Sequence, residues 1–290
     1  MKIDVEQMRK EFKEVDAKRD AGLVEPTTLE KFRDISYGPH GIDNTLDIYY
    51  PKGTDHKLPT LIHIHGGGFF YGDKELYRFY TMFLATQGFT VINFNYRLAP
   101  EHVYPAPLED INQVLQWTTE KHKNYYIDLD NLFLLGDSAG GQLTQHYATI
   151  VSNPDYQKLF DFKVPDIEFK AVGLNCGVYY IGNNIGTSDD FPYYLDGKMT
   201  QATKAQLPVE QYMTTDFPPA YVMTASHDFL KETGQKLGQD LIALGNETYF
   251  KIYGNSDGSE LNHVFHIDQK SAIAKECNLD QLDFFRKHLS

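Results

Sequence analysis

The pattern that most constrains the fold of this chain is an alternation of short apolar runs with amphipathic stretches. Helical periodicity appears near residues 75–87, 107–121, 139–151, 230–244 and 269–288. The expected strands, which from the third onward are mostly β-branched or aromatic, are residues 33–37, 45–50, 60–65, 90–95, 132–136, 171–176, 220–226 and 248–253. This alternation predicts a mostly parallel sheet with helices on both faces.

Three segments depart from the alternation. The chain opens with a helix whose apolar stripe runs from Val5 to Val15. The first two expected strands are joined only by a short Gly-Pro-His-Gly segment, which favours an antiparallel hairpin at the edge of the sheet. Residues 177–217 form a long insertion without clear periodicity, and such insertions in compact domains are usually functional. We predict a single α/β domain over residues 1–290 that carries this insertion.

The net charge and the cysteine content indicate which binding partners and which cellular compartment to expect. Forty Asp and Glu against 27 Lys and Arg give a net charge of −13, and an acidic surface repels nucleic acid. No apolar run has the length of a membrane helix or of a signal peptide, so we expect neither. Cys176 and Cys277 have no metal-ligand spacing, and we expect two reduced thiols in a cytoplasmic protein, with one long-range disulfide as the alternative. The oligomeric state is left open.

The strongest chemical signal is an apolar strand that runs directly into Gly-x-Ser-x-Gly and then into a helix. Residues 132–143 read Leu-Phe-Leu-Leu-Gly-Asp-Ser-Ala-Gly-Gly-Gln-Leu. This is the context of a nucleophile elbow, a sharp turn that exposes the serine hydroxyl, and it predicts Ser138 as the nucleophile. Larger side chains at Gly136 and Gly140 would collide across so tight a turn. A plain glycine-rich turn is the alternative interpretation.

A second match to the same pattern shows how little the bare motif means. Residues 254–258 also read Gly-x-Ser-x-Gly after a strand, but the segment that follows them is polar and has no helical period. We therefore interpret Ser256 as part of a loop.

A glycine-rich segment follows the third expected strand. His65-Gly66-Gly67-Gly68 lies where backbone N–H groups can turn toward a common point, and acyl transfer needs such donors where the carbonyl oxygen becomes negative. A phosphate-binding loop is the competing interpretation, but no Gly-Lys-Ser/Thr follows. We expect His65 to hold the loop rather than to act as a base.

Three motifs follow one another along the chain: His65-Gly66-Gly67-Gly68, Tyr96-Arg97-Leu98-Ala99-Pro100-Glu101 and Gly136-Asp137-Ser138-Ala139-Gly140-Gly141. In sequence and in order they resemble the motifs of the hormone-sensitive-lipase-like family of α/β-hydrolases. The resemblance implies an α/β-hydrolase fold with an eight-stranded, mostly parallel sheet flanked by helices. It also implies a cap built from N-terminal helices and an insertion after the sixth strand, with counterparts in residues 1–30 and 177–217. The activity it implies is hydrolysis of short- to medium-acyl carboxylic esters, without a cofactor or a metal.

In α/β-hydrolases the catalytic acid follows the serine in sequence and precedes the histidine. Asp228 comes directly after a late expected strand, so we predict it as the acid. Asp257 and Glu260 are rivals that lie inside a loop. The family usually has Pro after this Asp, whereas Phe229 stands here, and we expect this departure to affect the stiffness of the loop more than its chemistry.

The catalytic base is expected after the last strand, where His263 and His266 both qualify. Asn262-His263-Val264-Phe265 resembles the family's His-x-Phe more closely, so we predict His263. The oxyanion is expected to be held by the N–H groups of Ala139, Gly67 and Gly68. Aromatic side chains that could line the substrate pocket, or could equally form the core of the cap, are Tyr71, Tyr179, Tyr180, Tyr193 and Tyr194.

The predicted function is a serine esterase for small, uncharged esters. An arylformamidase, an amidase or a deacetylase of acetylated sugars would use the same triad, because the triad reports the reaction and not the leaving group. A non-catalytic binding module is a third class, since plant hormone receptors that resemble this family have lost the catalytic histidine. The presence of His263 together with Ser138 and Asp228 argues against that class.

Overall fold

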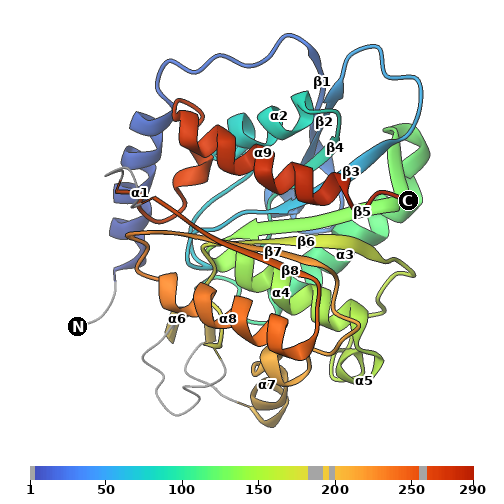
Figure 1. The fold of residues 1–290 in the computed structure, drawn as a ribbon, viewed down its shortest axis with the longest axis vertical. Helices are drawn as coiled ribbons and strands as arrows, with labels where there is room; N and C mark the ends of the chain where they lie inside the picture. The colour runs from blue at the N-terminus through green and yellow to red at the C-terminus, as the bar shows by residue number, and fades with distance from the viewer. Residues whose placement is uncertain (1–3, 182–191, 196–199, 255–259) are drawn as a thin grey trace.

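All eight expected strands are present, and they pair in one sheet in the order β1-β2-β4-β3-β5-β6-β7-β8 (Figure 1). The computed structural model describes residues 4–181, 192–195, 200–254 and 260–290. β1 pairs antiparallel with β2, as the short connection predicted, and β2 pairs antiparallel with β4. The remaining neighbours are parallel. The strands are β1 (Leu29–Ser36), β2 (Thr45–Pro51), β3 (Leu58–Ile64), β4 (Thr90–Phe94), β5 (Ile127–Asp137), β6 (Phe169–Asn175), β7 (Ala220–Ala225) and β8 (Thr248–Tyr253).

Helices cover both faces of this sheet, which confirms the predicted α/β-hydrolase architecture. On one face lie α2 (Arg78–Thr86) and α9 (Ala272–Arg286), and on the other lie α3 (Ala106–Lys121), α4 (Ala139–Ser152) and α8 (Lys231–Leu244) (Figure 1). Helix α1 (Val5–Asp20) has no buried residue and lies beside the sheet (Figure 1). The shorter helices are α5 (Pro154–Gln157), α6 (Pro192–Leu195), α7 (Gln201–Gln206), η1 (Gly41–Asn44), η2 (His122–Asn124), η4 (Val209–Gln211) and η5 (Phe265–Ile267).

The two faces are buried because side chains alternate along each central strand. On β5, Leu132 and Leu134 pack in the core cluster under α3 and α4, while Phe133 and Leu135 pack in the cluster under α2 and α9. All four side chains are fully buried. Burial of one such side chain stabilises the fold by roughly 1.5–3 kcal/mol, so the sheet holds the loops at its carboxyl ends on a rigid base.

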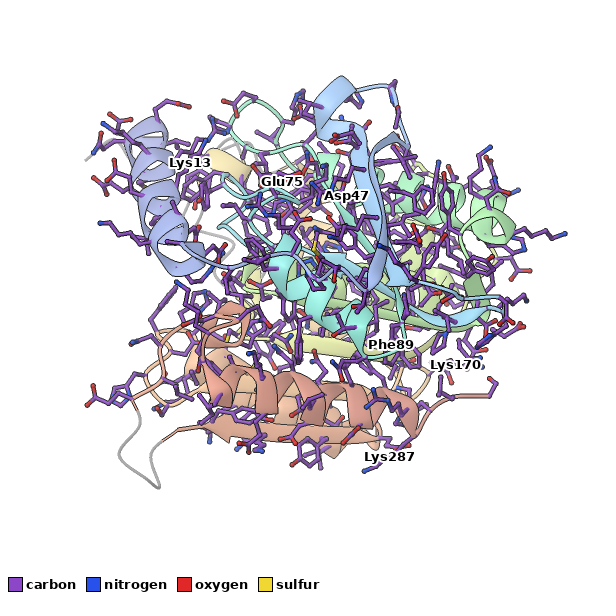
Figure 2. All side chains as sticks on the ribbon, turned by 90° about the horizontal axis from the view of Figure 1, so that it is seen from above. Lys13, Asp47, Glu75, Phe89, Lys170 and Lys287 are labelled. Atoms are coloured by element: carbon purple, nitrogen blue, oxygen red, sulfur yellow. The ribbon has the colours of Figure 1, made fainter. Side chains whose placement is uncertain are left out.

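A buried lysine joins the edge hairpin to the segment before α2. Lys74 Nζ lies 2.8 Å from carboxylate oxygens of Asp34 and Asp47 and 3.0 Å from Glu75; Asp47 and Glu75 are labelled in Figure 2. Burial alone would lower the pKa of Lys74, but hydrogen bonds to these carboxylates raise it well above its usual value. The lysine therefore stays charged and holds the segment between β3 and α2 against the edge hairpin.

Some boundaries differ from the expected ones. Cap elements are expected within residues 1–30, and the last two residues of this range, Leu29 and Glu30, belong to β1 and pair with β2. That segment has one helix among its described residues, not several. The insertion contains α6 and α7, while residues 182–191 and 196–199 lie outside the described part. Within the described residues, no helix is both long and apolar enough to cross a membrane.

Candidate active site

Ser138 lies at the turn between β5 and α4 in a backbone conformation that L-residues rarely adopt, with φ 53° and ψ −119°. A Cβ atom on Gly136 would collide with the backbone of Gly140, and one on Gly140 would collide with the carbonyl oxygen of Ile64. Both glycines are therefore required by the tight turn. A strained backbone conformation of this kind costs about 1–3 kcal/mol, and here it leaves the serine side chain partly exposed at the carboxyl end of the sheet.

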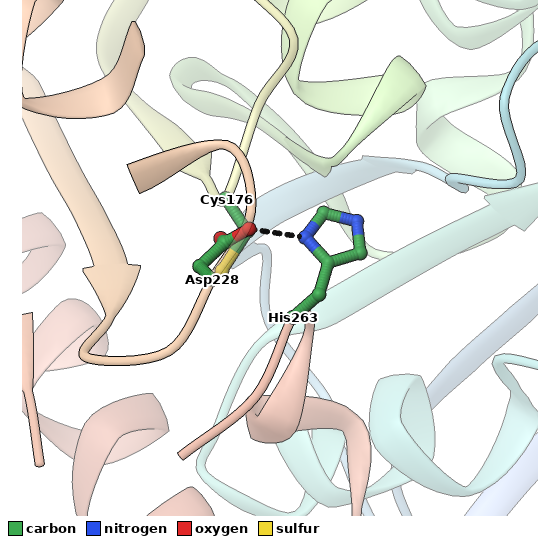
Figure 3. A group of neighbouring side chains, drawn as sticks. All are labelled: Cys176, Asp228 and His263. Atoms are coloured by element: carbon green, nitrogen blue, oxygen red, sulfur yellow. Dashed lines mark hydrogen bonds and ion pairs between the residues drawn. The ribbon is translucent and has the colours of Figure 1, made fainter. Parts of the chain in front are cut away.

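A continuous chain of hydrogen bonds links three side chains from three loops. His263 Nε2 lies 2.9 Å from Ser138 Oγ. His263 Nδ1 lies 2.8 Å from Asp228 Oδ1, the hydrogen bond drawn in Figure 3. Asp228 follows β7 and His263 follows β8, so the parallel sheet brings their loops to the same edge as the serine turn. Val264, next to the histidine, has a left-handed φ of 52°. The arrangement is that of a nucleophile, a base and an orienting acid.

Asp228 is held as a buried anion. Its side chain has no exposed surface; Oδ1 also accepts the N–H of Leu230 at 2.8 Å, and Oδ2 accepts the hydroxyl of Thr224 at 3.0 Å. Burial alone would raise the pKa of Asp228, but the hydrogen bond and the charge of His263 outweigh that effect and lower it. The carboxylate therefore stays ionised at neutral pH and fixes the orientation of the imidazole.

Cys176 lies beside the acid and the base (Figure 3). Its Sγ and one ligand atom each of Asp228 and His263 lie within 4.8 Å of one another, so the three side chains could offer ligands to a metal ion. Burial raises the pKa of the Cys176 thiol well above its usual value, which keeps it protonated and a poor ligand. A metal ion there would also have to replace the hydrogen bond between Asp228 and His263.

The glycine loop, which comprises residues 65–72, lies directly after β3. Gly67 and Gly68 have positive φ values of 114° and 61°, and among the described residues their N–H groups and that of Ala139 donate no hydrogen bond. The His65 ring is buried, donates from Nδ1 to the Gly66 carbonyl oxygen at 2.7 Å, and stacks on Tyr96 with ring centroids 4.1 Å apart. Burial lowers the pKa of His65 to about 4, so it is a neutral support of the loop.

Two side chains that hold the glycine loop were not singled out by the sequence. The Arg9 guanidinium, on α1, donates to the carbonyl oxygens of Phe70 and Ala99 and pairs with Glu101 at 2.7 Å. Tyr77 OH accepts the N–H of Gly66 at 3.1 Å and donates to Asp137 at 2.7 Å. The glycine loop is thus attached both to α1 and to the residue that precedes the serine.

The rival acids and bases lie apart from the hydrogen-bonded chain. Glu260 is exposed and lies 3.9 Å from His227, whose side chain is half-exposed. His266 is fully buried against Tyr80, and burial lowers its pKa to about 4. Asp257 and Ser256 lie outside the described residues. Among the described rivals, none is hydrogen-bonded to Ser138.

The candidate pocket tyrosines have different surroundings. Tyr193 packs edge-on against Phe70 of the glycine loop, with ring centroids 5.0 Å apart. Tyr71 OH donates to Asp16 on α1 at 2.7 Å, and Tyr180 OH donates to Asp240 on α8 at 2.7 Å. Tyr179 and Tyr194 are almost fully buried in the core. Tyr194 also stacks on Phe69, with ring centroids 4.0 Å apart. Tyr193 and Tyr194 therefore both pack against the loop that carries the candidate oxyanion donors.

Comparison with known proteins places this geometry among esterases. A family model described as the alpha/beta hydrolase fold matches residues 61–267. The chain is 28% identical over 225 residues to esterase LipI of Mycobacterium tuberculosis, which covers 72% of this chain and 68% of that protein. It is 25% identical over 263 residues to an acetyl esterase of Salmonella paratyphi B, which covers 85% of this chain and 77% of that protein.

Solved structures give the same picture. Esterase B of Lactobacillus rhamnosis, inhibited by a tributyrin phosphonate, is 30% identical with a TM-score of 0.89, and the match covers 98% of this chain and 94% of that one. A bacterial heroin esterase is 20% identical with a TM-score of 0.79 over 99% of this chain and 92% of that one. At this lower identity the likeness concerns the fold alone.

Proposed function

This chain belongs to the hormone-sensitive-lipase-like family of α/β-hydrolases and is a carboxylic ester hydrolase, and we propose that Ser138, His263 and Asp228 carry out the reaction through an acyl-serine intermediate. The observation that carries this assignment is the pair of hydrogen bonds at 2.9 Å and 2.8 Å that joins the three side chains. The strained conformation of Ser138 supports it further.

The roles follow from the order of the three side chains along this hydrogen-bonded chain. His263 Nε2 accepts the proton of Ser138 as Oγ attacks the ester carbonyl, and Asp228 stabilises the imidazolium that forms. The histidine then returns this proton to the leaving alcohol oxygen, and the acyl group stays on the serine. In the second half water attacks the acyl-serine and His263 takes a proton from it. The bond to Ser138 Oγ then breaks, His263 gives this proton to Oγ, and the carboxylic acid is released.

We assign the oxyanion hole to the N–H groups of Gly67, Gly68 and Ala139. Gly67→Ala keeps the N–H group but is expected to displace it, and so to lower kcat about 10²- to 10³-fold, the usual effect of losing one oxyanion donor. A Cβ at Gly67 would collide with the carbonyl group of Tyr71, and φ +114° is unfavourable for alanine. Gly53→Ala is a matched control, since Gly53 also has a positive φ but has open space around it. Comparable losses in kcat for both folded variants would remove Gly67 from the oxyanion hole.

We propose small, uncharged esters with short to medium acyl chains as substrates. The acetyl esterase among the relatives and the neutral aromatic side chains around the glycine loop support this class, with Tyr71, Tyr179, Tyr180, Tyr193 and Tyr194 as candidate substrate contacts. The alternatives that use the same triad are an arylformamidase, an amidase and a sugar deacetylase.

A substrate panel tests this choice. kcat/KM is measured for p-nitrophenyl esters from acetate to palmitate, beside an aryl formamide and a peracetylated sugar. We expect the highest values between acetate and hexanoate and a steep fall for longer chains. A higher kcat/KM for the aryl formamide or the acetylated sugar than for every simple ester would reassign the substrate. Absence of turnover on the whole panel would favour a binding module.

Three broader proposals accompany this function. Residues 1–290 form a single domain, which the one continuous sheet supports. The protein works in the cytoplasm, which the two buried free thiols of Cys176 and Cys277 support. It has no nucleic-acid partner, which its net charge of −13 supports.

A further inference from the structure

A large aromatic side chain is exposed directly beside the catalytic base. Phe229 immediately follows Asp228, and 77% of its surface is accessible. Its ring nevertheless packs on the imidazole of His263, with centroids 4.5 Å apart and planes tilted by 48°. Single exposed apolar residues are common and need no explanation. What distinguishes Phe229 is its contact with the group that must deliver a proton to the substrate.

The backbone that carries this ring is held by the same turn that fixes the acid. Asp228 N–H donates to the Ala225 carbonyl at 3.2 Å, Leu230 N–H donates to Asp228 Oδ1 at 2.8 Å, and Lys231 N–H donates to the Asp228 carbonyl at 3.1 Å. Leu230 then caps α8. Phe229 is therefore the projecting residue of a short turn whose neighbours on both sides are hydrogen-bonded.

The chemistry of the base places one part of the substrate near this ring. His263 gives its proton to the alcohol oxygen of the ester, so that oxygen must come within hydrogen-bond distance of Nε2. The carbonyl oxygen of the ester, in contrast, faces the candidate oxyanion donors, which are the N–H groups of the glycine loop and of Ala139. Groups attached to the alcohol oxygen thus start beside the histidine, and Phe229 is an exposed aromatic side chain in ring contact with that histidine.

We propose that Phe229 forms one wall of the alcohol-binding subsite and favours esters of aromatic or bulky apolar alcohols over esters of small polar alcohols. This inference rests on the proposed function of Ser138 and His263 and adds the leaving-group preference to it. An aromatic ring stacks on another ring or covers apolar surface, whereas a flexible polar chain gains little from it.

The test compares two acetates whose alcohols have similar acidity, benzyl acetate and 2-methoxyethyl acetate. Phe229→Ala is expected to lower kcat/KM for benzyl acetate about tenfold, mainly through KM, as loss of an apolar contact does. For 2-methoxyethyl acetate the change stays within about twofold. Phe229→Tyr keeps the ring and is expected to restore the preference. Tyr249→Ala is the matched control. Tyr249 is also an exposed aromatic residue, but it lies at the amino end of β8, whereas the catalytic histidine follows the carboxyl end of that strand.

Equal losses on both acetates, or a shift in the acid limb of the pH profile of kcat/KM, would overturn the proposal and make Phe229 a support of His263. An unchanged ratio in Phe229→Ala would overturn it as well. Ser138→Ala separates this inference from the proposed function. If Ser138→Ala retains turnover, the triad assignment fails, whereas an inactive Ser138→Ala with an unchanged ratio in Phe229→Ala refutes only the alcohol subsite.

Discussion

Ser138→Ala is expected to lower kcat for p-nitrophenyl butyrate by about 10⁵- to 10⁶-fold, the loss typical of removing a serine nucleophile. The variant keeps the turn, because Gly136 and Gly140 remain and alanine is smaller than serine. The alanine removes the one oxygen that can form the covalent intermediate. Steady-state kinetics beside a circular dichroism melt measures both effects, and the melting temperature is expected to change little.

Ser256→Ala is the matched control within the same chain. Ser256 lies in the second Gly-x-Ser-x-Gly match, outside the described residues. Its replacement is expected to leave kcat within about twofold, the usual size of a change outside the catalytic machinery, because the polar sequence after it does not predict a nucleophile elbow. If both substitutions cost the same, the assignment of the nucleophile to the turn after β5 is wrong.

His263→Ala is expected to lower kcat as severely as Ser138→Ala, by about 10⁵-fold or more. Without the imidazole nothing takes the proton of Ser138 and nothing returns it to the leaving alcohol. Because serine and histidine act as one unit, the double variant is expected to be no slower than either single variant. A full kinetic cycle of the two substitutions measures this non-additivity.

Two other histidines control for the loss of an imidazole. His227, half-exposed next to the acid, is expected to tolerate alanine with less than about a twofold change in kcat. His266 is fully buried, so alanine there is expected to lower the melting temperature by opening a cavity, with a far smaller effect on kcat of the folded fraction. A greater loss of kcat in His266→Ala than in His263→Ala would move the base.

The sheet could be predicted from the sequence because its strands are apolar and its helices periodic. The misplaced ends have local reasons. β5 begins at Ile127 rather than 132 because Ile127 and Asp128 pair with β3 across a bulge, although Asp128 and Asp130 interrupt the apolar pattern. β1 likewise begins at Leu29, where a charged stretch pairs with β2. Pairing with a neighbouring strand overrides local composition at such ends.

The candidate triad could be predicted because each member comes after a strand and the three follow a fixed chain order. The supports of the site could not. Arg9 reaches Glu101 across 92 positions in the chain, and Tyr77 reaches Asp137 across 60. Such contacts depend on where loops end in space, which no local pattern specifies. For Phe229 the sequence signal was its departure from the usual proline, but only the structure places its ring on His263.

The most direct test of the central claim is identification of the residue that an organophosphate ester modifies. Diethyl p-nitrophenyl phosphate is attacked at phosphorus by an activated serine oxygen, which releases p-nitrophenolate and leaves a diethylphosphoryl group on the enzyme. Peptide mass spectrometry of the inactivated protein is expected to find one such group per chain, on Ser138. Modification of Ser256 instead, or complete inactivation with Ser138 unmodified, would contradict the account.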